Sequence, residues 1–251
     1  MHTDRNRFIR ALLGAAMAVL VCADAMAQDD GGIVATVLGA NITWSDLAAQ
    51  TDDRPNARKL LASIWNRVAV DYVETRGLGA TPDEIAELAA YDRRFEAKDR
   101  LQRARKLAEL DQRLADGSLN PDQRAHLLEF QATLRRLAND DAASDEEPPE
   151  NTEQKAVFYA RWIEMWKMNK ALHEEYGGVV ARASFGPDPH GARAALLRNY
   201  EERGLLAIAD DTLRAEVHAA LDARPSAVIP ADKVDFTPYW KRPIPPSYFP
   251  D

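Results

Sequence analysis

The feature that most constrains this sequence is a long helical pattern with a defined start and stop. Thr81-Pro82-Asp83-Glu84 supplies an N-cap residue, a proline at the first helical position and acidic residues in the first turn. Asp116-Gly117-Ser118 interrupts the pattern. Apolar side chains recur between them at helical spacing: Ile85, Leu88, Tyr91, Phe95, Leu101, Leu107, Leu110 and Leu114. The sequence therefore predicts a helix from Pro82 to about Ala115.

Further helices follow from the same periodicity and from capping residues. They are predicted over 58–76, 121–137, 153–176, 190–203 and 210–223. Gly77 ends the first of these, and Gly177-Gly178 ends the third. A short strand is predicted within 179–184, with a turn over 186–189.

Near the N-terminus the pattern changes from helical to extended. Residues 33–38 form an apolar stretch typical of a strand, and Gly39-Ala40-Asn41 predicts a turn. Thr43 is suited to cap a short helix with Asp46 three residues later. The predicted fold class is mainly α with a small N-terminal β-hairpin, arranged as two helical lobes.

An acidic segment separates these lobes. Residues 139–154 hold seven acidic side chains, two prolines and no basic side chain. Such a segment buries too little apolar surface to offset its ordering, which predicts a flexible linker. A calcium loop is the alternative, but the alternating ligands and the central glycine are missing. The predicted organisation is a helical domain over 28–138, the linker, a C-terminal lobe over 155–224 and a tail over 225–251.

The first 27 residues have the pattern of an export signal. Three arginines precede an apolar run over 11–22, and Ala25-Met26-Ala27 predicts cleavage after Ala27. The arginines are Arg5, Arg7 and Arg10. A lipoprotein site at Cys22 is the alternative, although Val21 stands where a small residue is expected. We therefore expect a periplasmic or secreted protein whose mature chain has no membrane span.

Composition narrows the classes of partner. The chain holds 40 acidic and 32 basic residues, a net charge of −8. This balance disfavours nucleic acid, because neutralising phosphates requires a basic face. Cys22 is the only cysteine and lies within the predicted signal, so the mature chain would have neither disulfides nor thiolate chemistry.

No motif for catalysis or cofactor binding is found in the sequence. Phosphate-binding loops, G-x-S-x-G elbows and H-E-x-x-H patterns are all missing. A zinc site would require the fold to bring His173-Glu174-Glu175 and Glu216-Val217-His218 together, and surface histidines are the simpler interpretation. We therefore predict no catalytic residues, no cofactor and no metal.

The most distinctive surface is an aromatic segment within the helix predicted over 153–176. Aromatic and methionine side chains together form an adaptable apolar surface of the kind that binds varied peptides. The candidate peptide-binding residues are Phe158, Tyr159, Trp162, Met165 and Trp166. The alternative is a core helix that the C-terminal half of the chain covers.

The tail combines prolines with aromatic residues. Residues 225–251 contain seven of the fourteen prolines, which predicts an extended or polyproline-like segment. Its aromatic residues are Phe236, Tyr239, Trp240, Tyr248 and Phe249. We expect them to pack on their own chain, with partner binding as the alternative.

Residues 33–95 resemble the N-terminal region of SurA-type and PpiC-type periplasmic chaperones and prolyl isomerases. Residues 34–47 read Val-Ala-Thr-Val-Leu-Gly-Ala-Asn-Ile-Thr-Trp-Ser-Asp-Leu, and residues 76–85 read Arg-Gly-Leu-Gly-Ala-Thr-Pro-Asp-Glu-Ile. Leu38 departs from the usual Asn before the turn glycine, and the paired histidines and glycine-rich stretch of the isomerase domain are missing. The resemblance implies a chaperone scaffold without isomerase activity. It also implies that residues 228–239 pack near 33–37.

Three functions are compatible with these observations. The leading hypothesis is a periplasmic chaperone-like protein that binds unfolded or extended exported polypeptides without catalysis. The first alternative is an envelope assembly or structural protein with one fixed protein partner. Peptidyl-prolyl isomerase activity is the only enzyme class considered, and it ranks last.

Overall fold

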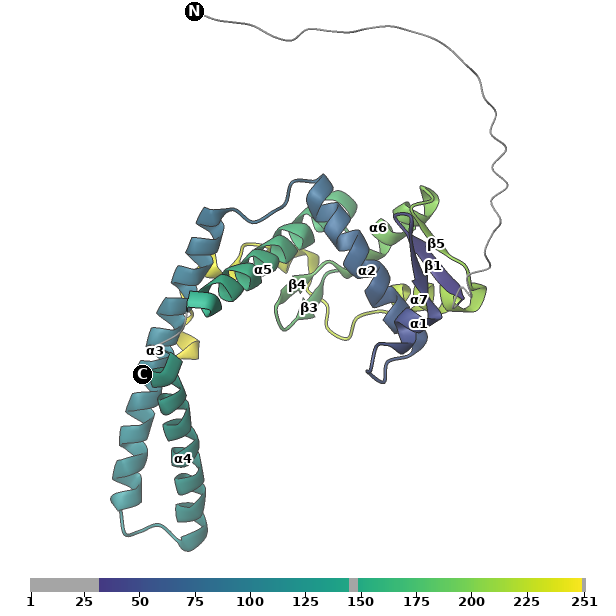
Figure 1. Ribbon diagram of the computed structural model, residues 1–251. Helices are drawn as coiled ribbons and strands as arrows, with labels where there is room; N and C mark the ends of the chain where they lie inside the picture. The colour runs from purple at the N-terminus through teal and green to yellow at the C-terminus, as the bar shows by residue number, and fades with distance from the viewer. Residues whose placement is uncertain (1–31, 145–148, 250–251) are drawn as a thin grey trace, which may run out of the picture.

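The computed structural model describes residues 32–144 and 149–249, and these are mainly helical with a small antiparallel sheet near the N-terminus. The predicted class, mainly α with a small N-terminal β-hairpin, is thus confirmed. Figure 1 shows a body on one side, which contains the three-stranded sheet, and a long two-helix arm that projects from the other. The helices are α1 (Trp44–Ala48), α2 (Asn56–Thr75), α3 (Pro82–Ala115), α4 (Pro121–Ser144), α5 (Pro149–Tyr176), α6 (His190–Glu202) and α7 (Asp211–Asp222). The strands are β1 (Ile33–Val37), β2 (Ala40–Thr43), β3 (Ala181–Ala183), β4 (Gly186–Asp188) and β5 (Leu206–Ile208).

The main sheet has the order β2-β1-β5, and both pairings are antiparallel. The turn between β1 and β2 places Leu38 and Gly39 at positive φ, 52° and 78°. On the other edge of β1, Thr36 pairs with Ala207. The segment over 228–239 was expected near β1, and this prediction is wrong because β5 occupies that edge. Val228 instead forms a bridge with Ala181 in β3.

The core of the body draws on residues far apart in sequence. Val34 and Val37 from β1 belong to the same buried cluster as Leu60 and Ile64 from α2 and Leu197 from α6. All five side chains are at most 2% exposed. The two predicted lobes therefore share one core, and the sequence boundary at 139–154 does not separate two bodies.

Local capping explains why two helices begin where the sequence predicts. Thr43 and Asp46 form a capping box at α1, where the Thr43 amide donates to Asp46 Oδ2 over 2.8 Å. Thr81 and Glu84 do the same at α3, also over 2.8 Å. Each box satisfies amides that the first helical turn leaves unpaired.

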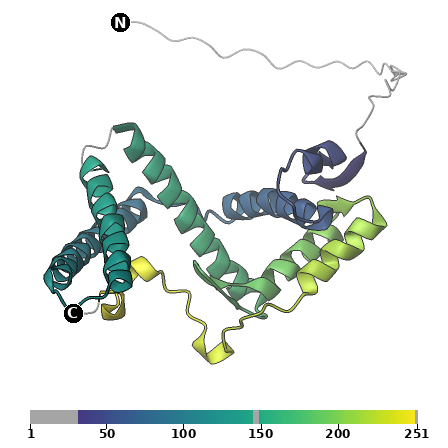
Figure 2. The ribbon, with the colours of Figure 1, turned by 90° about the horizontal axis from the view of Figure 1, so that it is seen from below.

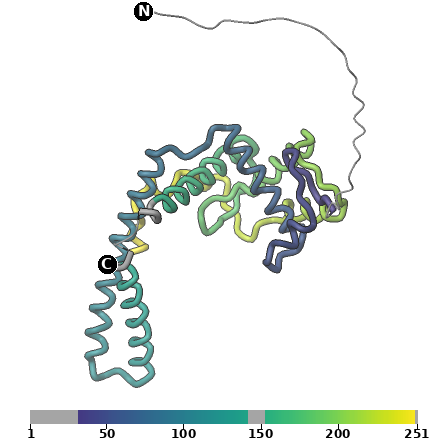
Figure 3. The backbone as a smooth tube through the Cα atoms, in the orientation of Figure 1, coloured from purple at the N-terminus to yellow at the C-terminus, as the bar shows by residue number. Residues whose placement is uncertain are grey.

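The arm is an antiparallel hairpin of α3 and α4 (Figure 3). Far from the body it buries few side chains, chiefly Leu110, Gln131 and Leu134. Charged contacts supplement them, since Arg103 pairs with both Asp99 and Asp141.

Residues 139–154 were predicted to be a flexible linker, but helices extend into this segment from both ends. α4 continues to Ser144 and α5 begins at Pro149. Residues 145–148 lie outside the described residues. A segment dense in acidic residues can extend a helix that is already formed, because elongation costs far less than nucleation.

The described part of the tail runs from the body toward the arm (Figure 2). It contains three short 3-10 turns and no α-helix within residues 225–249. Phe236 and Trp240 are 9% and 4% exposed, so the tail packs on its own chain as expected. The predicted turn over 186–189 is instead mostly strand, because β4 pairs with β3 as a small hairpin.

Candidate functional site

A second apolar cluster lies where the arm joins the body. It contains Leu88 and Tyr91 from α3, Ile163 and Trp166 from α5, and Trp240 from the tail. Each of these side chains is at most 7% exposed. Three segments distant in sequence therefore pack together here, and this packing fixes the location of the candidate site.

Trp166 is the anchor of this junction. Its indole Nε1 donates to the Phe236 carbonyl over 2.6 Å. Its ring makes edge contacts with Tyr239 and Trp240, at centroid distances of 5.8 and 5.4 Å. Gly186 has φ of +125°, and a Cβ there would lie 2.8 Å from the Trp166 ring. The β3–β4 hairpin can approach the indole so closely because residue 186 lacks a side chain.

An open cleft lies beside Trp166, with a volume of about 660 Å³. Aromatic side chains form most of its wall, and we call this the aromatic cleft. Its aromatic residues are Tyr91, Phe95, Trp162, Trp166, Phe185, Tyr239 and Tyr248. They come from α3, α5, the β3–β4 hairpin and the tail.

The rim of the aromatic cleft is accessible to solvent. Phe158 is 59% exposed and stacks on Trp162 with a centroid distance of 5.9 Å. Trp162 in turn makes an edge contact with Phe185, which is 39% exposed. Tyr248, on the tail side, is 61% exposed. A row of apolar rings thus leads from the surface into the cleft.

Asp92 supplies a carboxylate to the wall of the aromatic cleft. Burial and a hydrogen bond to Asp92 raise the pKa of the Tyr159 hydroxyl. Burial, with the negative charge of Asp92, raises the pKa of Tyr239 to about 12. Both phenols therefore stay protonated at neutral pH. Tyr159 uses its hydroxyl to donate to Asp92, whereas the Tyr239 hydroxyl belongs to the lining of the cleft.

The five predicted peptide-binding residues do not share one face. Phe158 is exposed, Tyr159 and Trp162 are partly buried, and Trp166 is buried in the junction. Met165 points the other way, into a separate hollow that Trp65 and Val73 of α2 also line. The prediction of a core helix thus holds for Trp166, whereas Trp162 lines the cleft and Phe158 stacks on Trp162 from the solvent side.

Three residues of the cleft were not predicted to lie at a binding surface: Tyr91, Phe95 and Phe185. Tyr91 and Phe95 stand four residues apart and read as part of the buried stripe of α3. Phe185 stands in a turn-like segment with no periodicity. Only the meeting of α3 with the β3–β4 hairpin brings them to one cleft.

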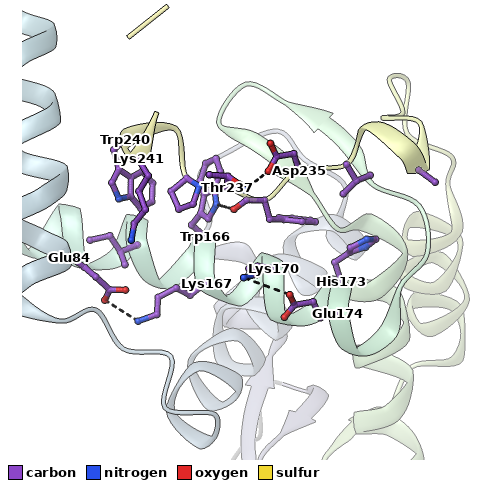
Figure 4. A pocket seen from close by; sticks show the side chains of 15 residues that line it. Glu84, Trp166, Lys167, Lys170, His173, Glu174, Asp235, Thr237, Trp240 and Lys241 are labelled. Carbon is purple, nitrogen blue, oxygen red and sulfur yellow. Dashed lines mark hydrogen bonds and ion pairs between the residues drawn. The ribbon is translucent and has the colours of Figure 1, made fainter. Parts of the chain in front are cut away.

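On the other side of Trp166 lies a charged hollow of about 590 Å³ (Figure 4). Lys167 Nζ is 3.0 Å from Glu84 Oε2 and donates to the Gly79 carbonyl over 2.8 Å. Lys170 and Glu174 form another pair, at 3.7 Å. Each of these two lysines is paired with a nearby carboxylate, so the two pairs add no net charge to the hollow.

The fold does not assemble the zinc alternative. His173 packs against the ring of Phe236 at 5.2 Å, whereas His218 lies 3.1 Å from Glu201. Among residues 32–144 and 149–249, no three His, Cys, Asp or Glu side chains are grouped so as to hold a metal ion. Over the same residues, no helix is both long and apolar enough to cross a bilayer.

Comparison with known proteins gives no relative. The chain matches no family model, no curated protein and no solved structure.

Proposed function

We propose that this protein is an exported, chaperone-like protein that binds unfolded or extended polypeptide segments without catalysis. The aromatic cleft is the binding site in this proposal, and it requires no cofactor. The export pattern over 1–27 supports a periplasmic or secreted location. The resemblance over 33–95 to SurA-type chaperones supports the same class of function.

The observation that carries the proposal is the open, ring-lined cleft, with exposed Phe185 and Tyr248 in its wall and exposed Phe158 stacked on Trp162 beside it. Exposed aromatic rings bind apolar side chains and prolines with little loss of conformational entropy, because their own torsions are few. The Tyr239 hydroxyl and the Asp92 carboxylate add hydrogen-bonding groups for a peptide backbone or a basic side chain.

An assembly protein with one fixed partner is a second candidate, and the arm favours it. Leu101, Leu128 and Phe130 are 55%, 46% and 46% exposed there. Exposed large apolar side chains that recur on one projecting element are typical of a protein interface.

Suppression of aggregation tests the first proposal. Residues 28–251 are mixed at equimolar ratio with a urea-unfolded outer-membrane β-barrel protein, and light scattering is followed on dilution. We expect wild type to suppress scattering and Phe158→Ser to raise the concentration needed by about fivefold, in line with loss of an aromatic contact.

Phe130→Ser is the matched control, since it removes the same side chain at similar exposure from the arm. The proposal predicts that Phe130→Ser behaves as wild type. If wild type does not suppress scattering, the chaperone proposal fails. A loss confined to Phe130→Ser would move the binding surface to the arm and favour the fixed-partner candidate.

A further inference from the structure

A cavity in the body, remote from the aromatic cleft, is lined by an unusual number of positively charged side chains. It lies where the first half of α2, the start of α6 and the end of α7 converge, and its volume is about 430 Å³. Four arginines line it: Arg54, Arg58, Arg193 and Arg224. None of the described residues in its lining is Asp or Glu. In a chain with a net charge of −8, this is a local concentration of positive charge.

Two of the four arginines are neutralised by carboxylates just outside the cavity. Arg54 pairs with Asp52 at 2.7 Å, and Arg193 pairs with Asp188. Arg58 and Arg224 form no ion pair with any side chain described in 32–141 or 153–249. Two guanidinium groups are therefore available to pair with an anionic ligand.

Two buried nitrogens in the same lining also lack a hydrogen-bond partner among the described residues. They are Arg193 Nε and His190 Nε2, both from the first turn of α6. The Arg193 guanidinium lies 4.9 Å from the centroid of the Trp65 ring, which holds it in place. A buried N–H without an acceptor is destabilising, and Arg193 Nε–H is such a donor. His190 Nε2 is a second donor when it carries the ring proton, so an oxygen acceptor in this cavity would satisfy both nitrogens.

The remaining lining is apolar. It consists of Leu61, Ala62, Trp65, Ala220, Leu221, Ala223 and Pro225. A ligand that fits would combine an oxyanion, held by guanidinium groups, with a small apolar body against Trp65.

We propose that this cavity binds a small organic oxyanion, a carboxylate or a phosphate monoester that carries an aromatic or aliphatic group. Arg58 and Arg224 supply the uncompensated charge, and Arg193 and His190 supply oriented donors. The site is independent of the peptide-binding proposal.

Calorimetric titration of residues 28–251 at low salt tests this assignment. The probes are benzoate, phenyl phosphate, inorganic phosphate and benzyl alcohol. We expect benzoate or phenyl phosphate to bind, inorganic phosphate to bind more weakly, and benzyl alcohol not to bind. The stronger of the two organic anions identifies the oxyanion as carboxylate or phosphate.

The variant Arg58→Gln/Arg224→Gln should weaken the organic anion by about tenfold or more, as expected for loss of charge-assisted hydrogen bonds. Its control is Arg105→Gln/Arg182→Gln, which removes the same charge from exposed positions elsewhere and should bind as wild type. In wild type, the anion should also shift the ring proton signals of His190 in NMR spectra.

Several results would overturn the assignment. They are no binding of either organic anion, equal weakening in both double variants, unmoved His190 signals, or equal affinity for inorganic and phenyl phosphate. Aggregation suppression should be unchanged in Arg58→Gln/Arg224→Gln, so failure here is distinguishable from failure of the chaperone proposal.

Discussion

The body and the arm are both largely helical, yet different forces stabilise them. In the body, buried side chains from β1, β5, α2, α5, α6 and α7 form one continuous core. Beyond the junction, the arm has only two helices, and two helices side by side can enclose few side chains. The comparison shows that the same helical periodicity yields a core only where several elements converge.

In the arm, polar contacts contribute a larger share of the stabilisation. Arg103 bridges Asp99 on its own helix and Asp141 on α4. Gln131, itself only 7% exposed, donates to Asp111 Oδ1 over 2.5 Å. Leu101, Leu128 and Phe130 meanwhile remain exposed. We therefore expect local unfolding to be more frequent in the arm than in the body. We also expect high salt to weaken the arm more than the body.

The largest expected effect comes from the body core. Leu60 has no exposed surface, and Leu60→Ala would leave a cavity between α2 and its neighbours. We expect the free energy of unfolding to fall by about 3 kcal/mol. Urea unfolding followed by circular dichroism measures this fall.

Leu110→Ala is the matched variant in the arm, where Leu110 is 2% exposed. It should leave the body transition unchanged and accelerate amide hydrogen exchange over 100–135, because the arm opens locally. If Leu110→Ala destabilises the body as much as Leu60→Ala does, the body and the arm unfold as one cooperative unit.

A smaller effect is expected from the charged bridge of the arm. Arg103→Gln removes the cation between Asp99 and Asp141 and should destabilise the arm by about 1 kcal/mol. In wild type, hydrogen exchange in the arm should quicken at 1 M salt, because screening weakens the bridge. Exchange in α2 serves as the internal control and should be unaffected by either change.

The smallest expected effect is a pH dependence in the body. Burial alone would raise the pKa of Glu175, but hydrogen bonds from Arg76, Tyr72 and Tyr176 outweigh it and hold that pKa below its usual value. Because the folded pKa is depressed, the stabilisation is present above the unfolded pKa of about 4.3 and is lost as pH falls through the folded value.

Glu175→Gln should therefore lower stability by about 0.5–1 kcal/mol at pH 7 and by less at pH 3. Urea midpoints of wild type and variant at the two pH values measure this difference. An equal difference at pH 7 and pH 3 would show that the negative charge of Glu175 does not contribute to stability. Glu74→Gln, on the same helix as Tyr72, is a suitable control because no carboxylate–tyrosine bond involves it in the described structure.

Helices with strong local information were predicted well. α3 spans Pro82–Ala115 as predicted, because its capping box and the stop at Asp116-Gly117 are encoded in adjacent residues. The β1–β2 hairpin was predicted for the same reason. β5 was not, since Leu206–Ile208 is three residues long and becomes a strand only by pairing with β1.

The candidate site was predicted only in part. The sequence identified the aromatic residues of α5, but their common face was assumed from helical spacing. α2 covers Met165, whereas α3 and the tail cover Trp166, so the structure divides that face. The cationic cavity was not predicted at all, because its arginines stand up to 170 positions apart, from Arg54 to Arg224.

The sequence by itself determined where most helices begin and end, and that the fold is mainly helical. Periodicity and capping act within a few residues, so they can be read along the chain. Tertiary structure alone decided that both halves share one core, that β5 rather than the tail pairs with β1, and which rings face the aromatic cleft. These outcomes depend on which distant surfaces can be buried together, and burial is a property of the packed chain rather than of any local segment.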